Sequence, residues 1–212
     1  MNDEEKKAEK DYNDWSRTEN VNHIGGMNAP KINDEEIKLI KKTNPKKILD
    51  IGCGNGKRLF SYLEKHNIDY LGVEKFERLV NDDKYSKKII VSDFLELDIS
   101  NLKGIDTITI LGGSLNGIFG IDKQKLFWDK IVEILPKSGK VIFDSLVLDG
   151  FDTRDEIGIV NLIPNIMPPQ YFLSNKQLKN IFKNRNLEIL NQSEIQIPGP
   201  HTLRYYLLEK KS

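Results

Sequence analysis

The stretch ILDIGCGNGKRLF, residues 48–60, joins an apolar run directly to a helical pattern through three glycines. Glycine permits a tight turn with positive φ and lets backbone amides approach a ligand closely. A strand, a glycine turn and a helix in this order are typical of the first unit of an open α/β fold, in which ligands bind at the carboxyl ends of the strands. The junction therefore predicts an α/β domain with a ligand site at this turn.

Apolar segments and amphipathic segments alternate along the rest of the chain. The predicted strands are KILDI, DYLGVE, KIIV, TITIL and KVIFDSLV, and between them stand helical segments such as GKRLFSYLEKH and DKQKLFWDKIVEIL. Apolar strands that alternate with helices predict a mostly parallel sheet with helices on both faces. The end of the chain differs, because LEILNQSEIQI and LRYYLLEKK follow one another without a helix. Two strands joined by so short a connection must pair antiparallel.

Local signals mark further elements. Asn33 with Glu36, and Ser174 with Gln177, have the spacing of capping boxes and predict two helix starts. Residues 1–10 are mostly charged and lack a clean apolar period. We expect them to form a frayed arm.

Composition narrows the class of protein. The chain has 212 residues, enough for one ordinary domain, and its 32 basic residues balance 32 acidic ones. No net field would therefore draw it to nucleic acid or to an anionic membrane. A single cysteine excludes an intramolecular disulfide, and no stretch of about eighteen apolar residues offers a membrane span. We expect a reduced, cytoplasmic protein without a membrane partner.

The glycine spacing argues against a dinucleotide cofactor. The dinucleotide fingerprint is G-x-G-x-x-G, whereas Gly52, Gly54 and Gly56 form G-x-G-x-G, and Lys57 stands where the third dinucleotide glycine belongs. Asp50 precedes the turn, and its carboxylate would repel a phosphate but attract an ammonium. The turn therefore favours a ligand with an amino acid end.

The motif LDIGCGNG resembles the first motif of the class I S-adenosylmethionine-dependent methyltransferases. The resemblance extends from about Lys46 to the C-terminus through YLGVEK, VSDFLE and IDTITILGG, in the order of the family. It implies a Rossmann-like seven-stranded sheet, mostly parallel with a C-terminal antiparallel hairpin. It also implies S-adenosyl-L-methionine as the cofactor.

The resemblance assigns the cofactor site residue by residue. Glu74 matches the acidic residue that binds both ribose hydroxyls, Asp93 the residue that bonds the adenine amino group, and Phe94 a neighbour against the ring. Structural alternatives are a plain tight turn for the glycines, a helix-start carboxylate for Glu74 and an N-cap for Asp93. The implied cofactor-binding residues are Asp50, Gly52, Cys53, Gly54, Asn55, Gly56, Glu74, Lys75, Asp93, Phe94 and Leu111.

We expect a small-molecule acceptor, methylated at nitrogen or oxygen. Relatives that methylate base amines carry Asn/Asp-Pro-Pro-aromatic after the fourth strand, where this chain reads LGGSLNG, and MPPQYF at 167–172 lies beyond the fifth strand. Small-molecule relatives build the acceptor pocket from an N-terminal segment, the loop after the fourth strand and an insertion before the last helix. An RNA or protein methyltransferase, and a cofactor-binding partner protein without its own chemistry, stay open as alternatives.

The same resemblance suggests a domain division. DYNDW is similar to the aromatic N-terminal helix of small-molecule members, so residues 1–44 are predicted as an arm and helices that form a lid over the substrate. Residues 45–212 would form the cofactor-binding domain. Residues 148–173 would be an insertion in it, and so long a connection is usually functional or disordered.

Candidate residues for the acceptor side are fewer. Tyr12 and Trp15 could cover the sulfonium or the substrate, or simply anchor the first helix, and Asn116 follows the fourth strand. His23 is the first candidate for a general base and Asp144 the second, although orienting the reactants could supply most of the acceleration without a base. Metal-dependent catechol-type relatives need clustered acidic and amide ligands after the fourth strand, where LGGSLNG offers only Asn116. Metal-independent transfer is therefore expected.

Overall fold

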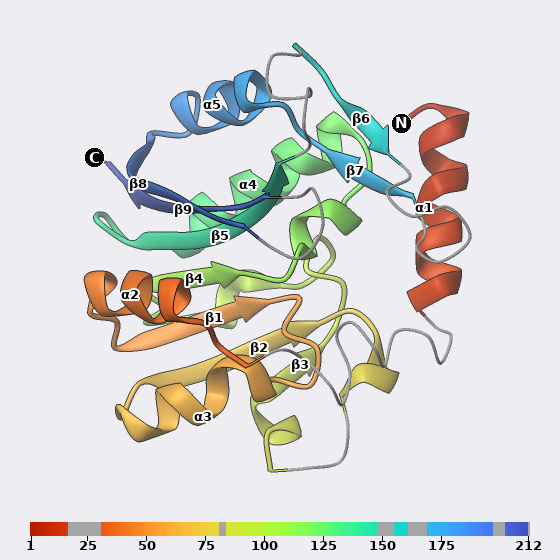
Figure 1. Cartoon of the computed structure of the whole chain (residues 1–212). Helices are drawn as coiled ribbons and strands as arrows, with labels where there is room; N and C mark the ends of the chain where they lie inside the picture. Colours follow the sequence, from red (N-terminus) through yellow and green to blue (C-terminus); the bar gives the residue numbers. More distant parts are fainter. Residues whose placement is uncertain (17–30, 81–83, 148–154, 161–168, 197–201, 212) are drawn as a thin grey trace.

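The strands carry the architecture of the protein. The computed structural model (Figure 1) describes residues 1–16, 31–80, 84–147, 155–160, 169–196 and 202–211. The strands of its large sheet are β1 (Lys47–Ile51), β2 (Asp69–Glu74), β3 (Ile89–Val91), β4 (Thr107–Ile110), β5 (Lys140–Val147), β8 (Leu187–Gln196) and β9 (Thr202–Lys210). They form a seven-stranded sheet in the order β3-β2-β1-β4-β5-β9-β8.

The pairing confirms the predicted fold class. Strands β1 to β5 pair in parallel, whereas β9 runs antiparallel to both β5 and β8. The first strand lies between β2 and β4, so the chain reverses its direction of winding there. Open α/β sheets place their ligand sites at such a switch point.

Helices begin close to the residues that the sequence predicts. The helices are α1 (Asp3–Ser16), α2 (Asp34–Thr43), α3 (Lys57–Lys65), α4 (Ile121–Ile134) and α5 (Asn175–Lys183), with 3-10 turns η2 (Glu77–Leu79), η3 (Ser86–Lys88), η4 (Ile99–Asn101) and η5 (Ser114–Gly117). Both predicted capping boxes are present, at Asn33 before α2 and at Ser174 before α5. None of the described helices is long and apolar enough to cross a bilayer.

Two hydrophobic cores lie on opposite faces of the sheet. In β1, Ile48 joins the core beside α2 and α3, while the next residue, Leu49, joins the core beside α1, α4 and α5. In β5, Ile142 and Phe143 divide in the same way. Because successive strand residues point to opposite faces, the helices cover both of them, as predicted.

The N-terminal segment differs from the expectation. The predicted frayed arm at residues 1–10 is wrong, because α1 begins at Asp3 and packs beside the sheet (Figure 1). Ala8 is buried in the larger core, and Lys123 of α4 forms an ion pair with Glu9 at 2.6 Å. Such a charged helix depends on tertiary packing more than on its own propensity, and this packing is not visible in the local pattern.

The predicted insertion contains a small second sheet. Strands β6 (Gly158–Val160) and β7 (Gln170–Phe172) pair antiparallel. The side-chain amide of Asn116 in η5 donates to Oε1 of Gln170 in β7 at 3.2 Å. The insertion is thereby attached to the turn that follows β4, at the carboxyl edge of the large sheet.

Candidate functional site

A cavity of about 220 Å³ lies where β1, β2 and β4 end and beside the residues that follow β3. The carboxyl ends of parallel strands meet at one edge, which is why residues far apart in sequence converge there. The predicted site residues that line the cavity are Tyr12, Trp15, Asp50, Gly52, Cys53, Gly54, Glu74, Lys75, Asp93, Phe94 and Leu111.

Some predicted residues lie elsewhere. Asn55, Gly56, Asn116 and Asp144 do not line the cavity. The side-chain oxygen of Asn55 accepts a hydrogen bond at 3.1 Å from the backbone amide two residues later, at the start of α3. His23 lies outside the described residues.

The glycine turn brings two loops into contact. Gly52 has φ of +71°, and a Cβ there would lie 2.4 Å from Oγ of Ser114, in the turn after β4. The Ser114 hydroxyl donates to the carbonyl of Leu111 at 2.8 Å and lies 3.2 Å from the carbonyl of Gly52. A side chain at Gly52 would push these turns apart beside the cavity.

We expect Gly52→Ala to lower the free energy of unfolding by about 1–3 kcal/mol more than Gly104→Ala. Gly104 is a matched control, because its φ is +74° but nothing lies within 4 Å of an added Cβ. Urea denaturation of both variants measures the difference. Equal losses would show that Ser114 does not restrict the turn.

Glu74 ends β2 and faces the glycine turn. Its Oε2 accepts from the backbone amide of Gly54 at 2.8 Å and its Oε1 from that of Phe76 at 3.0 Å. Burial raises the pKa of this carboxyl, and the backbone hydrogen bonds offset part of the rise. A carboxylate has about four acceptor positions, so positions remain for a ligand after these two bonds.

Asp93 has two interactions within the protein. Its Oδ1 accepts from the backbone amide of Leu95 at 2.9 Å, and its Oδ2 forms an ion pair with Nζ of Lys75 at 3.0 Å. Phe94 is buried and lies edge-on to Phe127 of α4, with ring centroids 5.1 Å apart. Asp93 therefore stabilises the turn after β3 and lines the cavity, but no helix begins there for it to cap.

Asp50 is a buried acid at the cavity. Its Oδ1 accepts from the hydroxyl of Thr109 at 2.7 Å and its Oδ2 from that of Tyr70 at 3.2 Å. Burial raises its pKa to about 7, although both hydroxyls and Arg58 favour the charged form. A nearby ligand cation would favour ionisation further.

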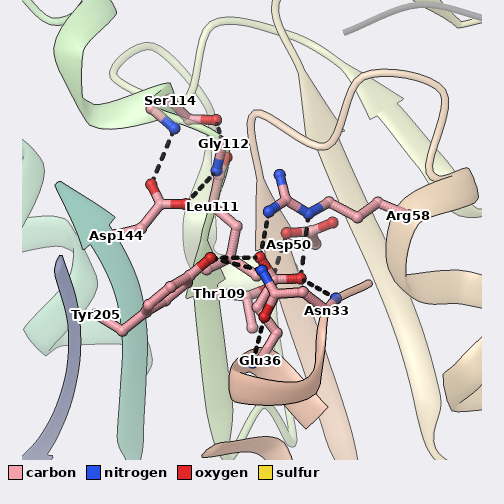
Figure 2. A network of polar contacts seen from close by, with 11 residues as sticks. Asn33, Glu36, Asp50, Arg58, Thr109, Leu111, Gly112, Ser114, Asp144 and Tyr205 are labelled. Atoms are coloured by element: carbon pink, nitrogen blue, oxygen red, sulfur yellow. Dashed lines mark hydrogen bonds and ion pairs between the residues drawn. The ribbon is translucent and has the colours of Figure 1, made fainter. Parts of the chain in front are cut away.

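Asp144 occupies a different position (Figure 2). It is fully buried, and its two oxygens accept from the backbone amides of Gly112 and Gly113 at 2.7 and 2.9 Å. Burial raises its pKa to about 6. These contacts favour a role in holding the turn after β4, so its role as a base stays a prediction that the geometry disfavours.

The two N-terminal aromatic residues, Tyr12 and Trp15, line the cavity. The ring of Tyr12 is edge-on to Phe119, with centroids 5.8 Å apart, and tilted against Trp15 at 6.5 Å. A Cβ on Gly117 would lie 2.9 Å from the Tyr12 ring, so helix α1 packs closely on η5. The rings therefore anchor helix α1, and the same packing places both of them at the cavity.

Sequence reasoning missed a buried polar network beside the glycine turn (Figure 2). Arg58 of α3 lines the cavity and forms an ion pair with Glu36 of α2, which is fully buried. Glu36 was visible only as a capping residue. Arg58 stands two residues after Gly56, and this position beside the predicted site was the one available signal.

The polar groups of the cavity fit a nucleoside with an amino acid end. The cavity offers a glycine cradle, a carboxylate with acceptor positions left and a buried acid for an ammonium. In the parts of the chain that the structure describes, no group of three or more His, Cys, Asp or Glu could hold a metal ion.

Sequence comparison finds a partial relative. No family model matches the chain. A protein of Geobacillus sp. (strain WCH70), named as a candidate methyltransferase, is 27% identical over 115 residues. The match covers 52% of this chain and 46% of the relative, so the chain spans about half the length of that relative.

Solved structures match over nearly the whole chain. An S-adenosylmethionine-dependent methyltransferase from Clostridium acetobutylicum ATCC 824 superposes with a TM-score of 0.67 at 15% identity, covering 95% of this chain and 99% of that one. The 1,6-didemethyltoxoflavin-N1-methyltransferase of Burkholderia thailandensis, with 1,6-didemethyltoxoflavin and S-adenosylhomocysteine bound, superposes with a TM-score of 0.63 at 14% identity, covering 98% of this chain and 87% of that one. Together with the strand order and the position of the cavity, these matches show that the chain has the fold of the class I S-adenosylmethionine-dependent methyltransferases.

Proposed function

We propose that the protein binds S-adenosylmethionine and transfers its methyl group to a nitrogen or oxygen of a small molecule. The observation that carries the proposal is the convergence of Asp50, the glycine turn, Glu74 and Asp93 on one cavity. Asp50 could bind an ammonium, and the glycine turn lets the backbone approach the ligand closely. Glu74 could bind the two ribose hydroxyls, and Asp93 the adenine amine. The partial relative and the fold support the same activity.

Binding and orientation are the main tasks of the chain's own residues. The bound cofactor supplies an activated methyl group, for which the leaving group is a neutral thioether. Glu74 would hold the ribose hydroxyls, and Phe94 would contact the adenine beside Asp93. Holding the acceptor in line could supply up to about 7–11 kcal/mol of barrier lowering. An amine acceptor then needs no base, whereas a hydroxyl would need one, for which His23 stays the first candidate.

The surroundings of the cavity suit a small molecule as methyl acceptor better than a polynucleotide. Tyr12 and Trp15 line the cavity, and β7 of the insertion is attached to η5, whose Ser114 and Gly117 line it too. The balanced charge of the chain offers no general attraction for a polynucleotide. One structural neighbour is named for its action on 1,6-didemethyltoxoflavin, a small molecule.

Calorimetry with S-adenosylhomocysteine and with NADH tests the cofactor. We expect saturable binding of S-adenosylhomocysteine and none of NADH; the reverse result would contradict the proposal. A screen of amines, phenols and carboxylates with methyl-labelled cofactor then tests the acceptor class. Efficient methylation of transfer or ribosomal RNA at physiological salt would overturn the small-molecule assignment.

Tyr12→Ala and Trp15→Ala test whether these two aromatic rings contact the cofactor. If these rings cover the sulfonium, each variant should lose about 2- to 30-fold of its affinity for S-adenosylmethionine relative to S-adenosylhomocysteine, because only the former is cationic. Tyr62→Ala is the control, since Tyr62 of α3 contacts His66 at the end of that helix and does not line the cavity. An unchanged affinity ratio in both variants would assign the rings to packing alone.

A further inference from the structure

The polar network of Figure 2 has an imbalance of charge beside the cavity. Glu36, Asp50 and Asp144 are 0%, 5% and 0% exposed, and they come from α2, β1 and β5. Arg58 is the cation drawn among them, and its charge favours the ionised form of both aspartates. Buried carboxylates are costly without cations, so this region is suited to a ligand that brings positive charge.

Arg58 is held in a fixed orientation. Its Nε donates to Oε2 of Glu36 at 3.3 Å, and its Nη2 donates to Oε1. Glu36 is fixed in turn, because the backbone amide of Asn33 and the hydroxyl of Tyr205 each donate to it at 3.2 Å. The guanidinium is thus oriented by segments from α2 and β9 before any ligand arrives.

The remaining nitrogen of Arg58 is directed away from Glu36 (Figure 2). It lies 2.7 Å from the position that a Cβ on Gly112 would occupy, and both residues line the cavity. The hydrogen bonds found among the described residues use Nε and Nη2 of Arg58, and none uses Nη1. Gly112 has no side chain that would occupy this position beside Nη1.

A guanidinium whose one edge is already paired can still bind a second carboxylate. Its planar fork matches carboxylate geometry, and charge-assisted bonds of this kind are the strong ones. Asp50 lines the same cavity and carries the opposite charge. Together they provide a cation and an anion for the two charged groups of an α-amino acid.

We propose that Arg58, oriented by Glu36, binds the α-carboxylate of the cofactor's amino acid end and makes the site selective for ligands that carry this carboxylate. The inference rests on the proposed cofactor and adds a residue that the glycine motif does not identify. In it Arg58 contacts the ligand, while Glu36 is a positioning residue. The alternative is that the ion pair only joins α2 to α3.

Two ligands separate these roles: S-adenosylhomocysteine and its decarboxylated analogue, which keeps the amine. Calorimetry should show that the wild-type protein binds S-adenosylhomocysteine about 10- to 100-fold more tightly than the analogue. Arg58→Met should bind S-adenosylhomocysteine more weakly than the wild-type protein by the same factor. Its affinity for the analogue should stay within about twofold of the wild-type value. Lys57→Met is the matched control, because it removes an exposed positive charge from the preceding residue.

Arg58→Met leaves Glu36 buried without its cation and could fail to fold. The double variant Glu36→Gln, Arg58→Met, compared with Glu36→Gln alone, removes both charges and makes the same measurement. An equal loss for both ligands would assign the ion pair to structure and overturn the inference while the cofactor assignment stands. If the wild-type protein binds neither ligand, the cofactor assignment fails and the inference fails with it.

Discussion

Glu74→Ala is expected to weaken the binding of S-adenosylhomocysteine by about 100- to 10,000-fold, because two charge-assisted hydrogen bonds of about 1.5–3 kcal/mol each are lost. The carboxylate also accepts from the amide of Gly54, so its removal loosens the glycine turn in addition. Calorimetric titration measures the affinity. Unfolding should remain cooperative, since the side chain lies at the edge of the sheet and not within either hydrophobic core.

Glu77→Ala is the matched control for this variant. Glu77 lies three residues further on in η2, is exposed and does not line the cavity. Its removal changes the net charge equally and should leave the affinity unchanged. Unaltered binding in Glu74→Ala, or an equal loss in both variants, would defeat the assignment of Glu74 to the ribose.

Asp50→Asn is expected to stabilise the ligand-free protein while weakening cofactor binding by about 30- to 1,000-fold. Asparagine has the same shape, and its amide can accept from Thr109 and donate to the oxygen of Tyr70, whose hydroxyl can rotate. The variant therefore keeps the internal hydrogen bonds and loses the charge that an ammonium would need. Thermal denaturation should show a higher midpoint, by about 2–4 °C for each kcal/mol gained.

The stability of the wild-type protein should depend on pH, because Asp50 titrates. Burial raises the pKa of Asp50 to about 7, above its value in an unfolded chain, so the folded state binds the extra proton. The stability contributed by this residue is complete below about pH 4 and is lost as the pH rises towards 7. Asp50→Asn should remove that loss, and its stabilisation should therefore be larger at pH 8 than at pH 5.

Cofactor affinity should show the opposite trend. Asp50 must ionise to attract an ammonium, so wild-type affinity should fall by up to about tenfold for each pH unit below 7. Glu36, Arg58 and Asp144 face the same region, and Asp144 has a pKa of about 6. Asp50→Asn separates the contributions, because its affinity should be nearly flat where the wild-type affinity falls. Parallel profiles for the two proteins would place the titration elsewhere.

The sequence by itself determined the strands of the large sheet, the helices α2 to α5 and the order of these elements. Apolar strands alternating with helices, and the capping boxes at Asn33 and Ser174, depend on neighbours within a few residues, so a linear pattern records them. The same holds for the glycine turn, whose backbone conformation requires Gly52, Gly54 and Gly56. The carboxyl ends of the strands then placed Glu74 and Asp93 at one edge, because parallel strands with helical crossovers must end together.

Only the tertiary structure decided which side chains meet across the sheet edge. The charged N-terminal segment folds as α1 because Ala8 and Glu9 find partners on other elements. Asp144 resembles a free acid in the sequence, but folding directs both of its oxygens to backbone amides of the β4 turn. Arg58 forms an ion pair with the buried Glu36 because α2 and α3 pack on the same face of the sheet. Long-range partners decide the charge and orientation of each of these groups, and no local periodicity encodes them.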